Sequence, residues 1–493
     1  FVQYYLGLPI AMVILCATVV PIYHRSGVYT AYEYLEKRFD AKTRALVSTI
    51  FLIQRGLGVG VALSAPAIVL SVILGWPERY TTLAMGALVI AYTVAGGIKA
   101  VTWTDVQQMV IIFIGIITAL ITAIWLLPGT MSLMDAMSLA GAAGKLNAID
   151  TRFDLKTEFN IWSGIIGGLF LALAYFGTDQ SQVQRYLTGK SITASRLSLL
   201  FNAMAKVPMQ FLILFTGAIV FVFYIYERPP LIFHHVELEK IQRAAPAEYG
   251  AVEGRFNAAF EARKNAASRV LQAERAGDDA AYKRALNDYR VAQKSLDGAR
   301  REGFALAKTT GGDPKLNDTN HIFLSFVTRY MPAGLVGLVL AAIFAAAMST
   351  ISAEINSLAT VSVIDVYRRH IRKTAPDRHY LWASRVFTAF WGCYAIWFAQ
   401  YGAGLGSLVV AVNKVGSLFY GSMLGAFVLA FGFPHTRGTA AFIGVLAGQA
   451  AIIWGNLTLD ISFLWYNVLG CVVAVGTGLI VSALSPQPRV DTP

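Results

Sequence analysis

The stretch AAIFAAAMSTISAEINSLAT, residues 341–360, decides the fold class, because it lies in an apolar segment long enough to cross a bilayer. Small side chains dominate it, and they allow membrane helices to approach each other closely. Ser349 and Thr350 place two adjacent hydroxyls in this setting. Two interpretations are open. Either the hydroxyl oxygens bind a hard monovalent cation such as sodium, or they donate to the carbonyl four residues earlier, as is common in membrane helices.

The rest of the 493-residue chain shares this apolar character. Hydrophobic residues make up 56% and charged residues 14%, with a mean hydropathy of +0.55, whereas soluble domains carry about a quarter charged residues. This excludes a soluble enzyme and a nucleic-acid-binding chain, and no nucleophile–base or catalytic metal pattern is present. We expect an all-α integral membrane protein with about eleven transmembrane helices. The apolar segments are 2–22, 44–75, 81–96, 104–127, 161–180, 195–226, 332–364, 380–401, 405–432, 437–457 and 462–484.

Charges in the connections predict the orientation in the lipid bilayer. If the first segment runs from outside to inside, the cytoplasmic connections hold most of the Lys and Arg in short loops, as the positive-inside rule requires. Much of the net charge of +12 then marks the cytoplasmic side. We expect a multi-pass protein of the cell (inner) membrane. The cytoplasmic cations are Arg25, Lys37, Arg38, Lys42, Arg44, Lys99, Arg185, Lys190, Arg196, Arg368, Arg369, Arg372, Lys373 and Arg378.

Residues 227–331 interrupt the apolar pattern with dense mixed charge. They predict an external loop that carries two helices of roughly 25–30 residues, joined at Gly277-Asp278-Asp279. This insert, residues 235–310, is either a solvated helical hairpin or a docking arm for a protein partner. The domains expected are a transmembrane core at 1–226, the external loop at 227–331, a second core part at 332–485 and a cytoplasmic tail at 486–493. A thin apolar seam comes from Phe256, Phe260, Tyr282, Leu286 and Tyr289.

Charged residues inside the apolar segments are candidates for solute contact, because a charge in the bilayer is costly and usually functional. Arg55, beside Gln54, lies about 16 Å into its helix and so near the midplane. It either binds a substrate carboxylate or has a structural role, in which it pairs with another helix or extends to the cytoplasmic edge of the membrane. Lys206, just before Pro208, either contacts the solute or ties helices together.

A second candidate is the stretch LFLALAYFGTDQSQVQRYLTGK, residues 169–190, which changes from apolar to polar midway. A helix interrupted at Gly177 and followed by polar groups is how transporters expose backbone atoms at a midplane site. Tyr175 and Phe176 at the break would cover a substrate. The alternative is a plain helix end followed by a polar loop.

Taken together, several ordered stretches resemble the sodium:solute symporter family. These are GGIKAVTWTDVQQ (96–108), FGTDQSQVQRYL (176–187) and MSTISAEINSLATVSVIDVYRR (348–369), with TAYEYLEKRFD (30–40) and VNKVGSLFYG (412–421) matching as well. The resemblance covers nearly the whole chain outside the insert. It implies a leucine-transporter-type fold of two inverted five-helix repeats. Since Phe1 lies inside an apolar run, we expect an N-terminally truncated chain that lacks the discontinuous first helix of repeat one.

The resemblance also assigns roles to individual residues. The family's conserved sodium site falls on the hydroxyls of Ser349 and Thr350 and the carbonyl of Ala346. Tyr175 matches an inner-gate aromatic over the substrate, and Lys206 matches a lysine that lines the substrate site in sugar-transporting members. Asp105 matches the acid of the family's WTD motif, which implies either a sodium contact near the cytoplasmic exit or a helix-start role.

The function that follows is sodium-coupled symport of a small organic solute into the cell by alternating access, with Na+ as coupling ion and no cofactor. Gly58, Ala172 and Val412 replace polar sugar ligands, so the chain resembles the monocarboxylate, vitamin and iodide branch more than the sugar branch. Arg55 would suit an anionic solute there. The alternatives are a proton-coupled carrier of the same fold and a membrane solute sensor.

Overall fold

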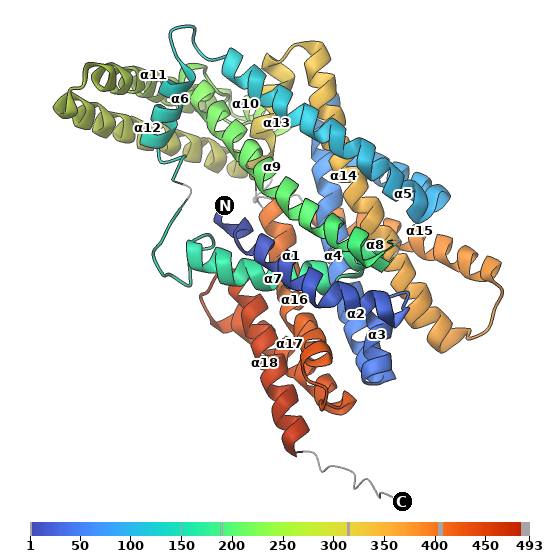
Figure 1. The fold of residues 1–493 in the computed structure, drawn as a ribbon. Helices are drawn as coiled ribbons and strands as arrows, with labels where there is room; N and C mark the ends of the chain where they lie inside the picture. The colour runs from blue at the N-terminus through green and yellow to red at the C-terminus, as the bar shows by residue number, and fades with distance from the viewer. Residues whose placement is uncertain are drawn as a thin grey trace, which may run out of the picture.

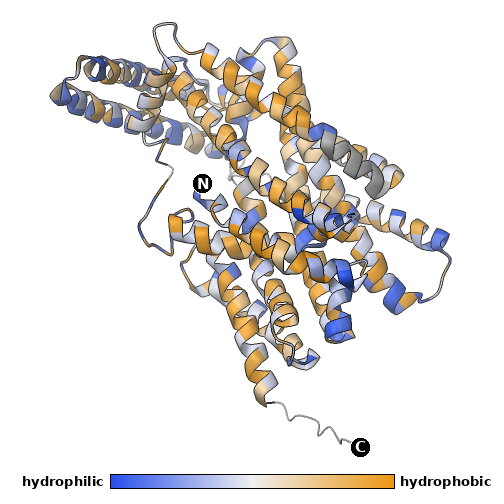
Figure 2. Ribbon diagram, viewed as in Figure 1, coloured by the Kyte–Doolittle hydropathy of each residue, from blue (hydrophilic) through white to orange (hydrophobic). Residues whose placement is uncertain are grey.

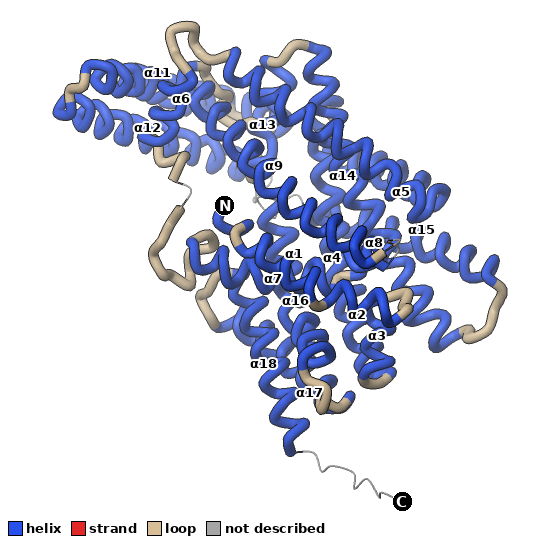
Figure 3. Tube along the Cα trace, in the orientation of Figure 1, coloured by secondary structure: helices blue, strands red, loops and turns tan. Residues whose placement is uncertain are grey.

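The computed structural model describes residues 2–147, 149–187, 189, 191–312, 316–402 and 408–484, with side chains except at 97–106, 401–402 and 409. Within these residues the chain is helical throughout, with loops between helices and no strand (Figure 3). The predicted tail, residues 486–493, lies outside the described part. The elements are η1 (Val2–Tyr5), α1 (Gly7–Ala17), α2 (Val19–Ser26), α3 (Ala31–Arg38), α4 (Ala41–Leu74), α5 (Glu78–Trp125), α6 (Leu133–Ala142), η2 (Ser163–Gly167), α7 (Gly168–Thr178), α8 (Gln180–Leu187), α9 (Ile192–Tyr226), α10 (His235–Ala244), α11 (Pro246–Ala276), α12 (Asp279–Thr309), α13 (Thr319–Tyr330), α14 (Ala333–Val361), η3 (Ser362–Ile371), α15 (Asp377–Gly402), α16 (Leu408–Gly432), α17 (Gly438–Thr458) and α18 (Phe463–Leu484).

Eight helices of the described residues are long and apolar enough to cross a membrane. Three further apolar segments of the sequence are helical but are not among these eight. Segment 81–96 lies in α5, segment 161–180 forms the shorter helical stretch Ser163–Thr178, and segment 380–401 lies in α15. The eight spans are Val2–Ser26, Ala41–Leu74, Gln107–Trp125, Ile192–Tyr226, Ala333–Ile371, Val410–Gly432, Gly438–Thr458 and Phe463–Leu484.

The structure differs from the sequence prediction at residues 81–127, where two helices were expected. Helix α5 instead runs for 48 residues without a break. Gly96 and Gly97 lower helix propensity by about 1 kcal/mol each, but the connecting residues contain no proline that would end the helix. Isolated polar residues between two apolar runs were therefore insufficient to stop it.

Polar side chains set the start of the second span. Thr30 caps α3 by accepting from the backbone N–H of Glu33, and Asp40 caps α4 by accepting from that of Thr43. Gly75 ends α4 in a left-handed conformation with φ of 66°, which glycine adopts without steric cost. The caps at Asp40 and Gly75 thus define the two ends of α4, the helix that carries Arg55.

A break separates α7 from α8, as the polar switch in this stretch predicted. The interruption falls at Asp179, whose backbone is extended (φ −80°, ψ 121°), rather than at Gly177. The Asp179 carboxylate accepts from the backbone N–H of Ser181 at 2.9 Å and so begins α8. Gly177 instead allows α7 to approach α1 closely, because a Cβ at this position would lie 2.9 Å from the Leu15 side chain.

The insert is a helical hairpin, as predicted, and it packs on the membrane core. Helices α11 and α12 have 31 residues each and meet at Gly277, with Asp278 capping α12. The predicted seam is buried at Phe256, Phe260 and Tyr289 and half-buried at Tyr282 and Leu286. Arg263 anchors the hairpin by donating to the Tyr224 carbonyl of α9 at 2.6 Å. Burial lowers the pKa of the Arg263 guanidinium.

Hydrophilic residues gather at the two ends of the helix bundle. The hairpin α11–α12 extends from one end, near α6 and α10, while α2, α3 and the link before α15 lie at the other (Figure 1). The membrane helices between these ends are mostly hydrophobic (Figure 2). The connections that the charge pattern predicts to be cytoplasmic are thus at the end opposite the hairpin.

Candidate functional site

Arg55 lies at the centre of a buried ionic cluster. Its Nη1 donates to Glu354 of α14 at 2.7 Å, and its Nη2 donates to Asp179 at the α7–α8 break and to the Tyr420 hydroxyl of α16. The Tyr420 hydroxyl in turn donates to Asp179 at 3.1 Å. All four side chains are buried. Of the two interpretations of Arg55, pairing with other helices is therefore the arrangement in this structure.

Two cavities meet beside this cluster. The larger, of about 370 Å³, lies between α5, α8, α9 and α14, and its lining includes Gln108, Arg185 and Ser198. The smaller, of about 180 Å³, lies between η1, α1, α4, α7 and α16, and its lining includes Tyr4, Asn413 and Tyr420. Five residues belong to both cavities and form the wall between them. These wall residues are Tyr175, Phe176, Lys206, Thr350 and Glu354.

The two aromatic residues of this wall come from the last turn and a half of α7. The rings of Tyr175 and Phe176 pack edge to face with centroids 4.8 Å apart. The Tyr175 hydroxyl accepts from Gln182 Nε2 at 2.9 Å, across the helix break. The predicted gate residues thus sit between the cavities, tied to α8.

Lys206 approaches both aromatic rings from α9. Its Nζ lies 5.9 Å from the Tyr175 ring centroid and 5.5 Å from that of Phe176, within the range of a cation–π interaction. Among the described residues no hydrogen bond or ion pair of Lys206 is found. Within this part of the chain, no carboxylate pairs with Lys206, whereas Arg55 has two carboxylate partners.

The residues assigned to sodium line the larger cavity on α14. Ala346, Ser349 and Thr350 are all part of its lining. The Thr350 hydroxyl donates to the Ala346 carbonyl at 3.0 Å, which is the back-bonded arrangement that the sequence left open. Tyr92 of α5 donates to the neighbouring Met348 carbonyl at 2.7 Å and holds this turn against α5. The three residues assigned to sodium therefore line one cavity from neighbouring turns of α14.

Two other predicted residues are Gln54, which lies outside both cavities, and Asp105, whose side chain the structure does not describe. Gln54 is buried, does not line either cavity, and its Oε1 has no hydrogen-bond partner in the described residues. The side chain of Asp105 lies outside the described residues, although helix α5 passes through this position. Of the positions without sugar-type polar groups, Ala172 and Val412 line the smaller cavity.

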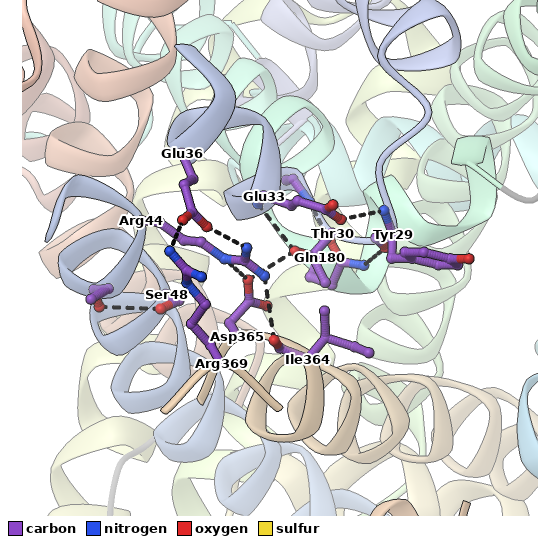
Figure 4. Close-up of polar contacts among 12 residues, drawn as sticks. Tyr29, Thr30, Glu33, Glu36, Arg44, Ser48, Gln180, Ile364, Asp365 and Arg369 are labelled. Carbon is purple, nitrogen blue, oxygen red and sulfur yellow. Dashed lines mark hydrogen bonds and ion pairs between the residues drawn. The ribbon is translucent and has the colours of Figure 1, made fainter. Parts of the chain in front are cut away.

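Sequence reasoning missed a second polar cluster, at the end opposite the hairpin. Arg44 lies between Glu36 and Asp365, donating to them at 2.7 and 2.6 Å (Figure 4). Thr30 also donates to Asp365, at 3.0 Å, and Arg369 pairs with the other oxygen of Glu36. The stretches TAYEYLEKRFD and VIDVYRR both contain acidic and basic residues, which could have indicated ion pairs between them. Which of these residues pair with each other depends on the fold.

Gln180 connects this cluster to the α7–α8 break. Its Oε1 accepts from the backbone N–H of Ala31 at 2.9 Å, and its Nε2 donates to the Tyr29 carbonyl at 3.1 Å (Figure 4). Asp179, the adjacent residue, pairs with Arg55. One short polar segment thus contacts both the ionic cluster at the cavities and the start of α3.

Comparison with known proteins places the chain among membrane carriers. A model of the sodium:solute symporter family matches residues 1–231 and 304–448, which leaves most of the hairpin outside the match. The human sodium-coupled monocarboxylate transporter 1 is 25% identical over 450 residues, covering 91% of this chain and 60% of the relative. The rabbit (Oryctolagus cuniculus) sodium-dependent multivitamin transporter is 25% identical over 548 residues, covering 99% and 72%.

Two further comparisons support the same placement. The human sodium/iodide cotransporter is 24% identical over 436 residues, covering 88% of this chain and 55% of the relative. The chain therefore spans between about half and three quarters of the length of these relatives. A solved structure of a Na+-coupled sialic acid symporter in a substrate-bound outward-open state superposes with a TM-score of 0.71 at 21% identity, covering 98% of this chain and 84% of that one. The likeness establishes the leucine-transporter-type fold.

Proposed function

Because this chain belongs to the sodium:solute symporter family, we propose that it is a sodium-coupled carrier of a small anionic solute. It is an integral, multi-pass membrane protein, and its family consists of transporters rather than enzymes. The cell (inner) membrane is the proposed location, with the hairpin outside. The relatives named for monocarboxylates and iodide carry anions, which fits the charge described next.

The observation that carries the proposal is the position of Lys206. It lies in the wall shared by both cavities and lacks a carboxylate partner among the described residues. An unpaired ammonium in a low-dielectric setting favours a negatively charged ligand. Arg55 is the weaker candidate for this role, because Asp179 and Glu354 already compensate its charge. Lys206 is thus the proposed contact for the solute carboxylate or halide, with Tyr175 and Phe176 covering it.

Sodium is proposed to bind at Ala346, Ser349 and Thr350. The carbonyl of Ala346 and the hydroxyl of Thr350 now satisfy each other, so a bound ion would take both oxygens in exchange for one hydrogen bond. Hydroxyl and carbonyl oxygens suit a hard cation and bury no counter-charge. Asp105, which the family resemblance assigns to the cytoplasmic exit, is proposed as a later contact for the sodium ion.

Alternating access then means that the shared wall opens to one side at a time. Solute enters the smaller cavity, passes Tyr175 and Phe176, and leaves through the larger one. The membrane potential contributes about 2.3 kcal/mol per charge per 100 mV to inward movement of the sodium ion. Sodium coupling, rather than proton coupling, supplies this driving force in the proposal.

The test uses the purified protein in liposomes with an imposed sodium gradient. Uptake of labelled monocarboxylates and iodide should require sodium outside, and Ser349→Ala/Thr350→Ala should abolish the sodium dependence. Thr216→Ala is the matched control, because its hydroxyl also donates to a carbonyl four residues earlier but lies away from both cavities. Uptake that ignores sodium and follows a proton gradient would establish the proton-coupled alternative.

A second experiment tests the anionic solute. Lys206→Gln should raise the half-saturating concentration of an anion at least about tenfold, corresponding to 1.4 kcal/mol, while Lys414→Gln should not. Lys414 is largely exposed and pairs with Glu158 at 3.6 Å. If Lys206→Gln leaves anion uptake intact, the solute contact lies elsewhere.

A further inference from the structure

Three side chains with metal-binding atoms converge at the hairpin end of the bundle. Glu78 is in the first turn of α5, His234 caps α10 just before the insert, and His321 is in the first turn of α13, which follows the insert. One ligand atom of each lies within 4.8 Å of the others. Residues from α5 and from the segments on both sides of the insert thus lie close together.

The distances in this group suit coordination better than hydrogen bonding. Nε2 of His234 lies 3.5 Å and Nε2 of His321 lies 3.6 Å from the same oxygen, Glu78 Oε1. Ordinary N–H···O bonds measure about 2.7–3.2 Å. Ligands bound to a tetrahedral ion at about 2.0–2.1 Å are separated by about 3.4 Å. The two nitrogen–oxygen separations are therefore close to those between ligands of one tetrahedral ion, and the two nitrogens lie within 4.8 Å of each other.

The two histidine rings converge on one carboxylate oxygen. His321 is buried, and the ring of His234 lies against it with centroids 4.5 Å apart. Both rings direct Nε2 toward Glu78 Oε1. Imidazole nitrogens and carboxylate oxygens are ligands that one transition-metal ion can share.

The backbone that carries both histidines is held by one residue, Asp318. Its carboxylate accepts from the backbone N–H of Phe233, next to His234, at 2.7 Å, and from Arg300 at 2.6 Å. Its carbonyl accepts from the backbone N–H of His321 at 2.9 Å. The two histidines are therefore positioned by a shared, buried support, which is a condition for a preformed site.

We propose that Glu78, His234 and His321 bind a divalent transition-metal ion, with zinc as the best match to the ligand set. Two imidazoles and one carboxylate are a common zinc set, in which water completes the tetrahedron. Binding through Nε2 places the ring proton of His234 on Nδ1, so its long 3.4 Å contact from the Glu237 N–H is given up. The ion would tie the segments on both sides of the insert to α5.

The test measures metal binding on the full chain in detergent, independently of transport. Titration calorimetry with ZnCl₂ after chelator treatment should show one saturable site, and Zn²⁺ should raise the melting temperature while EDTA reverses the rise. Glu78→Gln, His234→Ala and His321→Ala should each weaken binding at least about tenfold, since even an outer-sphere change costs 10–100-fold. His235→Ala is the control, because His235 is exposed and pairs with Glu239 at 3.3 Å.

Cobalt supplies a readout that does not depend on the variants folding. Co²⁺ added to the metal-free wild-type chain should give the intense visible absorption of tetrahedral coordination, and Zn²⁺ should remove it. Equal zinc affinity of His235→Ala and the three ligand variants, or an octahedral cobalt spectrum in the wild type, would overturn the proposal.

Discussion

Arg55 and Glu354 are joined by a 2.7 Å ion pair, although 299 positions separate them in the chain. The same glutamate lines both cavities, and its second oxygen, Oε2, is buried and has no hydrogen-bond partner among the described residues. The pair therefore connects the packing of α4 against α14 to the wall that a solute has to pass.

Removing the cation of this pair should be strongly destabilising. Arg55→Ala leaves Asp179 and Glu354 buried without compensation, and breaking a buried pair in this way costs about 3–5 kcal/mol. We expect a large fall in the melting temperature of the detergent-solubilised protein. Lys414→Ala should change it little, because its pair with Glu158 is exposed. A normal melting temperature for Arg55→Ala would show that the cluster is not structural.

Arg44 and Asp365 should behave as a coupled pair at the opposite end of the bundle. Arg44→Met leaves Asp365 buried without its cation, Asp365→Leu leaves Arg44 with Glu36 as its remaining partner, and the double change removes both buried charges. The coupling energy from a double-mutant cycle on thermal stability should therefore be at least about 1 kcal/mol, within the usual range for contacting residues. Additive effects would contradict a direct interaction, and Lys37→Ala serves as an exposed control.

Tyr175 should separate the cavities through its ring rather than its hydroxyl. Tyr175→Phe loses one hydrogen bond from Gln182, worth about 1 kcal/mol, and should keep most transport. Tyr175→Ala removes the ring from the shared wall and should produce solute leak without sodium. The measurement is solute efflux from loaded liposomes in the presence and absence of sodium. Equal leak in both variants would place the barrier elsewhere.

The hairpin should detach when its buried arginine is lost. Arg263→Ala gives up charged hydrogen bonds to Tyr224 and Gln293, each worth about 1.5–3 kcal/mol. Limited proteolysis should then cut within 246–309 faster than in the wild type. Arg269→Ala is the control, since its pair with Asp288 is exposed and lies within the hairpin itself. Unchanged proteolysis would mean that other contacts hold the hairpin.

Deletion of residues 246–309 tests the predicted protein partner at the insert. Within this fully described range, Val291 is the only large apolar side chain that is exposed. We therefore expect the deleted protein to keep its transport rate. A lost partner in a crosslinking comparison of the two forms, with transport unchanged, would make the insert a docking arm.

Local sequence signals predicted the architecture well. Apolar runs gave the membrane helices, and the Gly277-Asp278-Asp279 turn gave the hairpin, because these features depend only on neighbouring residues. The prediction was wrong where a local signal was weak: two glycines and scattered polar residues did not divide α5.

The site was less predictable, because its interactions join distant segments. Arg55 was singled out as an intramembrane charge, but its partners Asp179 and Glu354 are 124 and 299 positions away. Nothing in the sequence alone chooses between them and a solute. The Glu78 group escaped for the same reason, since its three members lie on three separate elements.

The shared wall sets a limit on how this carrier can be tuned. Tyr175, Phe176, Lys206, Thr350 and Glu354 face both cavities, so a substitution that tightens capture on one side also alters release on the other. Forward and reverse exchange rates should therefore change together in such variants. Selectivity that acts on one direction alone has to come from residues that line a single cavity, such as Asn413 or Ser198.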